Sequence, residues 1–252
     1  MHMHSIKKFP LLLAGLILLS FACKKDDPTP LTPPASSNNN NSNQGNPTPT
    51  DADAVVYALI QRTTQDSPFG PIELSQSVPF GVFVNNNGSP VSVGDVFVEG
   101  RKMTYLSGTY AYFPGFMDTM GLLEFQSNDV EWQVSGGNGF PSFTRVDNSY
   151  WPEIGLFTSS STLSKSSDFT VSVSGLVYAD STSFTIGENL SVTLPGSVSS
   201  YTFSSSELSS LSLISGELLA VSAYTLNKET IGSKNIYFAK MLVSQTPLTV
   251  TP

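Results

Sequence analysis

From residue 52 onwards, short apolar alternations are separated by glycine, proline, asparagine and serine. In residues 129–134, Val130, Trp132 and Val134 fall on one face of an extended chain, and polar side chains fall on the other. The same alternation recurs at residues 169–174 and 190–194, with Ser and Thr facing outward. Repeated short strands at this spacing predict an all-β fold, an antiparallel β-sandwich.

The remaining elements follow from local signals. Asn87-Gly88 accepts positive φ and predicts a hairpin between two apolar runs. Ser204 and Glu207 have capping-box spacing, so residues 205–211 are expected to form one or two helical turns. Further strands are expected at residues 54–60, 80–84, 91–93, 216–226 and 235–243.

The length of this β-rich part leaves two architectures open. About 200 residues suit either one large sandwich or two immunoglobulin-like modules of about 100 residues each. We favour two modules, residues 52–157 and residues 158–252, which meet at a serine-rich stretch. No internal sequence repeat marks the division.

The N-terminal end follows a different pattern. Lys7 and Lys8 precede an apolar run at residues 11–19, and a short segment ending in Ala22 leads to Cys23, the only cysteine. This order predicts an export signal over residues 1–22. The run is too short to span a bilayer, which takes about 20 apolar residues.

The ending of this segment resembles the lipobox of bacterial lipoproteins, in which the chain is cut before a cysteine that is then acylated. The resemblance implies that Cys23 is the lipidated N-terminus of the mature protein and that it anchors the chain in the outer membrane. Residues 25–27, Lys-Asp-Asp, also resemble the export tag of Gram-negative lipoproteins that face the exterior. The alternative is an ordinary secretory signal beside a free thiol.

Residues 23–51 read as the lipidated cysteine followed by a linker. Proline, threonine and asparagine dominate this stretch, which offers almost nothing for a core. Proline-rich ends favour extended geometry, and the Asn/Ser middle is flexible. The linker is therefore expected to be disordered and to hold the β-rich part away from the membrane.

A second resemblance rests on core and turn positions of the β-rich part. They are Trp132-Gln133-Val134 with Gly136-Gly137, Tyr201-Thr202-Phe203, Glu207-Leu208 and Gly216-Glu217-Leu218-Leu219. The chain resembles Bacteroidetes-type surface lipoproteins with a β-sandwich domain and no assigned activity. This resemblance implies a fold and a location, and it transfers no catalytic residue.

Charge and residue usage narrow the function. Cleavage after residue 22 would remove both histidines, His2 and His4, and would leave 10 basic side chains against 20 acidic ones. An acidic surface repels phosphate backbones, so nucleic acid is not an expected partner. Without histidine there is no Ser-His or Cys-His couple, and Gly-x-Ser-x-Gly and phosphate-loop motifs are also missing. We therefore expect no catalysis, no metal and no cofactor.

Two alternative functions, glycoside hydrolysis and calcium binding, would depend on carboxylate side chains. Asp129 and Glu131 lie two residues apart on one strand face, about 6.6 Å along the chain, a separation that glycosidase pairs use. That face is the polar one, so a solvated surface is the simpler interpretation. Calcium could be held by two other pairs, although no EF-hand motif is present. These pairs are Asp95 with Glu99 and Asp118 with Glu124.

Aromatic side chains supply the best candidate ligand site. Trp151, beside Tyr150 and Pro152, is the ring most expected to be exposed, and Tyr110 and Tyr112 lie in a second aromatic-rich stretch. Planar rings with polar tips stack on sugars and also anchor protein interfaces. We predict a non-catalytic binding module for glycans. A structural or protein-interaction role is the alternative, and core packing is the alternative for Tyr110 and Tyr112.

Two short stretches resemble sites of bacterial O-glycosylation. They are Asp118-Thr119-Met120 and Asp180-Ser181-Thr182. Modification would require both to lie in exposed loops.

Overall fold

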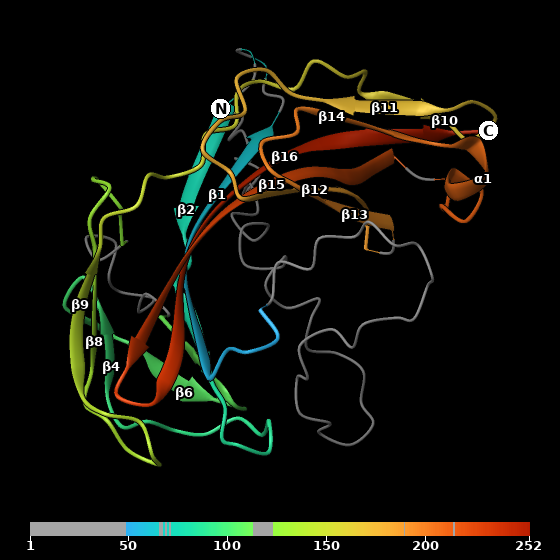
Figure 1. Ribbon diagram of the computed structural model, residues 1–252. Helices are drawn as coiled ribbons and strands as arrows, with labels where there is room; N and C mark the ends of the chain where they lie inside the picture. The colour runs from blue at the N-terminus through green and yellow to red at the C-terminus, as the bar shows by residue number, and fades with distance from the viewer. Residues whose placement is uncertain are drawn as a thin grey trace, which may run out of the picture. The chain divides into compact units, whose positions relative to one another are not determined.

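The computed structural model describes residues 49–65, 68, 70, 72–112, 123–188, 190–213 and 215–252. These residues form sixteen strands and one short helix, so the all-β, sandwich-type prediction is confirmed (Figure 1). The signal predicted over residues 1–22, the linker predicted over residues 23–51 as far as residue 48, and the candidate glycosylation and calcium residue Asp118 lie outside the described residues.

The largest sheet has ten strands. Its central path runs β13-β12-β15-β16-β1-β3-β7-β6, while β10 also pairs with β16 and β2 with β1. The strands are β1 (Ala54–Gln65), β2 (Ile72–Ser77), β3 (Phe80–Phe83), β6 (Thr104–Leu106), β7 (Thr109–Ala111), β10 (Thr162–Ser164), β12 (Ser181–Ile186), β13 (Leu190–Pro195), β15 (Ser215–Ile231) and β16 (Lys234–Thr251).

Two smaller sheets complete the fold. A four-stranded sheet has the order β5-β4-β8-β9, and β11 pairs with β14 in a two-stranded ribbon. The strands are β4 (Val96–Val98), β5 (Arg101–Lys102), β8 (Val130–Val134), β9 (Phe143–Asp147), β11 (Phe169–Ser172) and β14 (Ser200–Phe203). Helix α1 (Ser205–Leu208) begins at the predicted capping box of Ser204 and Glu207.

The long strands β15 and β16 form an antiparallel hairpin, visible as the two longest arrows in Figure 1. Strand β1 runs parallel to β16, from Ala54 opposite Ile236 to Thr63 opposite Gln245. The large sheet is therefore mixed rather than purely antiparallel. This pairing joins the beginning and the end of the described chain, so the boundary expected at residues 157/158 is not a break in the sheet.

The buried side chains form two hydrophobic cores. In the first, the four-stranded sheet packs through Val96 and Trp132 onto β1 and β16. In the second, the β11–β14 ribbon packs through Phe169 and Phe203 onto β12, β15 and β16. Even-numbered residues of β16 contribute to both cores. Ile236 and Phe238 belong to the first core, and Leu242, Leu248 and Val250 belong to the second.

Most predicted strands are present, and several are longer than expected. The alternation of Val130, Trp132 and Val134 is confirmed, because all three are buried. The hairpin around Asn87-Gly88 is reduced to a turn with one bridge between Val84 and Pro90, since β3 pairs instead with β1 and β7. Residues 91–93 form no strand.

A charged cluster joins the start of β1 to the start of β16. Asp53 accepts hydrogen bonds from the Lys234 ammonium at 2.8 Å and from the Asn235 amide at 2.8 Å. Burial alone would raise the pKa of Asp53, but these two donors and the charge of Lys234 lower it below its usual value. The charged carboxylate thus stabilises the parallel pairing.

We expect Asp53→Asn to destabilise the protein most near neutral pH. Because the pKa of Asp53 is lowered on folding, its contribution is present above its unfolded value of 3.8 and is lost as the pH falls through the folded value. The unfolding free energies of wild type and Asp53→Asn should therefore converge below pH 3.8. Urea unfolding between about pH 7 and about pH 2 checks this. A difference that is constant over this range contradicts the assignment.

Candidate functional site

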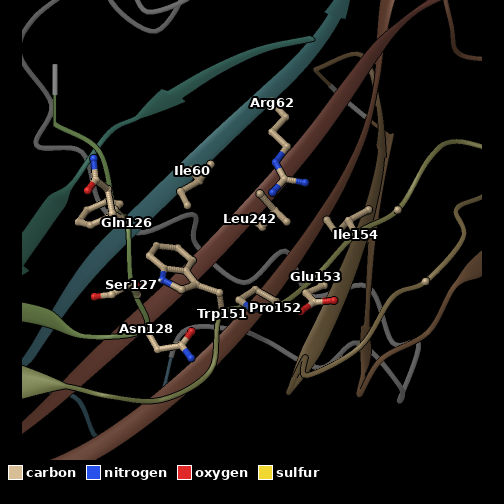
Figure 2. A pocket seen from close by; sticks show the side chains of 13 residues that line it. Ile60, Arg62, Gln126, Ser127, Asn128, Trp151, Pro152, Glu153, Ile154 and Leu242 are labelled. Atoms are coloured by element: carbon tan, nitrogen blue, oxygen red, sulfur yellow. Dashed lines mark hydrogen bonds between the residues drawn. The ribbon is translucent and has the colours of Figure 1, made fainter.

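A hollow of about 590 Å³ lies over the long strands where the two cores meet. Its floor includes Ile60 and Arg62 of β1 and Leu242 of β16, and its walls are the connecting segments 125–128 and 151–155. Figure 2 shows Trp151, Pro152 and Glu153 on one connecting segment, in front of the strands that carry Ile60 and Leu242. We call this site the Trp151 hollow.

The position of the floor follows from strand register. Ile60 pairs with Leu242, and both residues lie on the sheet face that packs into the cores. On this face Ala58 and Phe238 belong to the first core, whereas Leu242 belongs to the second. The hollow thus occupies the stretch of the sheet where one covering layer gives way to the other.

The two walls are tied to each other by Trp151. Its indole Nε1 donates a hydrogen bond to the carbonyl of Ser127 at 3.0 Å, and its ring centroid lies 5.3 Å from that of Phe125. The wall also needs glycine at position 155, because a Cβ there would lie 2.2 Å from the Ser174 carbonyl oxygen. Trp151 is half-buried and lines the hollow.

Lys240 holds both walls to the sheet. Its side chain is 0% exposed, and its ammonium donates to the carbonyls of Asn128 at 2.6 Å and Ser149 at 2.5 Å. It also pairs with the Asp147 carboxylate at 3.3 Å. Asn128 belongs to one wall, and Ser149 lies two residues before Trp151 on the other. One buried cation therefore fixes the spacing of the walls.

Asp147 is the matching buried anion, at 2% side-chain exposure. Its oxygens accept from the amide and hydroxyl of Ser149, both at 3.1 Å, and from the side-chain amide of Asn227 at 3.2 Å. Burial lowers the pKa of Lys240, and the charge of Asp147 opposes this shift. The pair is thus extensively hydrogen-bonded, as a buried ion pair must be.

The hollow offers one aromatic face and several hydrogen-bonding side chains. Arg62 lies 3.9 Å from Glu73 and is 38% exposed, and Glu153 is exposed at the rim. Gln126 and Asn128 add two amides from the opposite wall. Such a surface can stack against an apolar ring face and bond the polar groups around it.

The structure separates the four predicted ligand-binding aromatics. Trp151 lines the hollow, whereas Tyr150 is 64% exposed and its ring stacks on that of Tyr178 at 5.2 Å. Tyr110 is only 1% exposed, and its hydroxyl bonds the Val93 amide and the Gly94 carbonyl. Tyr112 is half-buried against the first core. The prediction of a ligand contact for Tyr110 is therefore wrong, because this side chain is part of the core.

The carboxylates of the weaker alternatives have other partners. Glu131 accepts from the Gln133 amide group at 2.5 Å, and neither Asp129 nor Glu131 is among the described residues that line the hollow. Asp95 pairs with Lys102 at 2.8 Å, and Glu99 accepts from the Glu131 amide at 2.6 Å. Within the described ranges, no group of three or more metal-ligating side chains is found.

The second candidate glycosylation site does not lie in an exposed loop. Ser181 is 8% exposed and Thr182 is 0% exposed, and both belong to β12. This corrects the expectation that the stretch is accessible, because pairing with β13 and β15 buries it inside the sheet.

Several hollow residues were missed from the sequence. Arg62 follows Ile60 by two positions, so the alternation of β1 could have indicated it had the strand been extended beyond residue 60. Segment 125–128 has no periodicity, and Glu153 lies outside any repeated pattern. Their convergence depends on tertiary contacts.

Comparison with protein-family models, with curated proteins and with solved structures finds no match for this chain. Within the residues described, no helix has the length and apolar character needed to cross a bilayer.

We expect Lys240→Met to lower the unfolding free energy by about 3–5 kcal/mol, since it leaves the Asp147 carboxylate buried without its cation. Adding Asp147→Asn should recover part of this loss, because no unpaired charge remains. Urea unfolding measures both variants.

Lys228→Met is the matched control. Lys228 pairs with Asp51, but its side chain is 42% exposed, so its loss should change stability little. Equal effects of Lys240→Met and Lys228→Met would contradict a special role of the buried pair.

Proposed function

We propose that this chain is a lipid-anchored outer-membrane protein, facing the exterior, whose β-sandwich binds a glycan in the Trp151 hollow without catalysing a reaction. The observation that carries the proposal is the half-buried indole of Trp151, set among guanidinium, carboxylate and amide groups.

A glycan matches this set of groups. A sugar ring has apolar C–H faces and a rim of hydroxyls, so it needs a flat apolar partner together with donors and acceptors. Trp151 supplies the flat partner, and Arg62, Gln126 and Glu153 supply hydrogen bonds. The volume of about 590 Å³ lies within the range of small-ligand sites, roughly 300–1,000 Å³.

The proposed location rests on the sequence. Cys23 follows an export-type apolar run, and the Pro/Thr/Asn-rich linker separates it from the first strand at Ala54. Several acyl chains on one residue give stable membrane attachment, whereas a single chain gives marginal binding. A tethered binding domain is useful where its ligand must be reached outside the cell.

A protein-interaction role is the second candidate, and a different surface favours it. The stacked rings of Tyr150 and Tyr178 are 64% and 55% exposed. Exposed aromatic side chains are typical anchors of protein interfaces. These residues are not among those that line the hollow, so the two candidates can be separated by mutation.

Trp151→Ala should weaken glycan binding by roughly 30-fold, which corresponds to about 2 kcal/mol for a central aromatic anchor. A glycan array probed with residues 24–252, with and without calcium, identifies the ligand class. Titration calorimetry then compares the affinities of wild type and variants. Circular dichroism checks that each variant is folded.

Tyr150→Ala is the control, because Tyr150 adjoins Trp151 in sequence but lies outside the hollow. Loss of binding in Tyr150→Ala with full binding in Trp151→Ala would move the site to the tyrosine pair. Silence across a broad array would favour the protein-interaction role. Shortening of a bound glycan during incubation would contradict the non-catalytic assignment.

The anchor makes a separate prediction. The mature protein from the membrane fraction should begin at an acylated Cys23, and Cys23→Ser should abolish acylation, as read by mass spectrometry of the N-terminal peptide. Protease added to intact cells should release the β-sandwich by cutting within the linker. A mature chain with a free Cys23 thiol would instead indicate an ordinary secretory signal.

A further inference from the structure

The Trp151 hollow is the middle of a longer depression. It shares Ile60, Phe125 and Gln126 with a hollow of about 380 Å³. It shares Arg62, Ile154 and Gly155 with another of about 220 Å³. Three adjoining hollows thus follow strand β1, and we call the whole depression the β1 groove.

Strand register explains how the floor of the groove is built. On β1, Ile60, Arg62 and Thr64 lie on the same face, with about 13 Å between the first and the last at strand spacing. Their partners on β2 are, in the same order, Ser77, Ser75 and Glu73. On the other side, Leu242 and Ser244 of β16 pair with Ile60 and Arg62. The floor is therefore apolar at the Ile60–Leu242 pair beneath Trp151 and polar over the positions that follow along β1.

The backbone of the central floor strand is already engaged. Residues 60–63 of β1 pair with β2 on one side and with β16 on the other. An extended peptide cannot add to this strand by main-chain hydrogen bonds, the usual way in which strands recruit peptides. Recognition must therefore come from side chains. The lining combines apolar and aromatic side chains with hydroxyls, amides and charges, which suits a ligand that repeats ring faces and hydroxyl groups along its length.

The charges of the groove select against an acidic ligand. Glu73, Glu124 and Glu153 line its three parts, whereas the described lining contains one cation, Arg62. Arg62 is itself 3.9 Å from Glu73, so its charge is partly offset. Uronate or sulfate groups would meet net repulsion here, as like charges do across an interface.

We propose that the β1 groove binds several consecutive units of a neutral linear polysaccharide, with Trp151 stacking on a central unit and the Ser/Thr floor bonding the units on either side. This inference rests on the proposed glycan-binding function and specifies its ligand as a chain rather than a terminal sugar.

Chain-length dependence tests the proposal. The probes are malto-, cello-, manno- and xylo-oligosaccharides of two to six units, with oligogalacturonates as acidic counterparts, titrated into residues 24–252. For the neutral series that binds, the hexamer should bind at least about tenfold more tightly than the dimer, a difference of roughly 1.4 kcal/mol. Oligogalacturonates should bind more weakly than the neutral hexamer.

A blocking variant locates the outer units. Ser75 is exposed on the β2 side of the floor, so Ser75→Trp should reduce the affinity for the hexamer by a larger factor than the affinity for the dimer. Thr170→Trp is the matched control, because Thr170 is also exposed on a strand but lies on β11, away from the groove.

The outcomes separate this inference from the proposed function. Equal affinities for dimer and hexamer, unaffected by Ser75→Trp, would overturn the chain-binding inference and leave a glycan site confined to the Trp151 hollow. Tighter binding of oligogalacturonates would overturn the selection for neutral chains. If no oligosaccharide binds and the glycan array also shows no binding, both the inference and the proposed glycan-binding function are wrong.

Discussion

One face of β16 must serve two hydrophobic cores in succession. Its even-numbered side chains pack first under the four-stranded sheet and then, from Leu242 onwards, with the β11–β14 ribbon. Side chains of a strand alternate strictly between faces, so a slip of one residue would remove every one of them from both cores. Pairing with β15 on one side and with β1 on the other fixes the register of β16. Because both cores use these strands, the two cores are coupled.

Lys240 lies on the same face, between Phe238 of the first core and Leu242 of the second. At this point the four-stranded sheet no longer covers β16 and the β11–β14 ribbon begins to cover it. The connecting segments that contain Asn128 and Ser149 place backbone carbonyls over the large sheet here. Buried carbonyls need donors, and an ammonium with three hydrogens can supply several of them together. Lys240 meets this need at Asn128 and Ser149 while Asp147 balances its charge. The region between the two cores is thus held together by hydrogen bonds and an ion pair instead of apolar packing.

Local sequence patterns predicted those parts of the fold that depend on local alternation. Strand β8 and the capping box before α1 belong to this class, because their signals lie within a few residues. The parallel β1–β16 pairing joins residues about 180 positions apart, and no local pattern specifies such a partner. For the candidate site, aromatic character pointed to Trp151, which lines the hollow, and also to Tyr110, which is buried in the core. A tyrosine hydroxyl can be satisfied inside a core as well as by a ligand. Arg62, Gln126 and Glu153 reach the hollow from separate elements, so only the tertiary fold brings them together.

The floor and the walls of the groove are subject to different constraints. Floor side chains on β1 and β16 share a sheet face with both cores, so substitutions there also alter packing and register. The walls are irregular segments tied down at Lys240 and at the bond between Trp151 and Ser127, which leaves exposed positions such as Gln126 and Glu153 free of core contacts. For the proposed glycan site, walls that are fixed before binding would reduce the ordering cost of association, so affinity would not need a large contact area. Substitutions of wall residues would then change specificity while the sheet and its two cores stay the same.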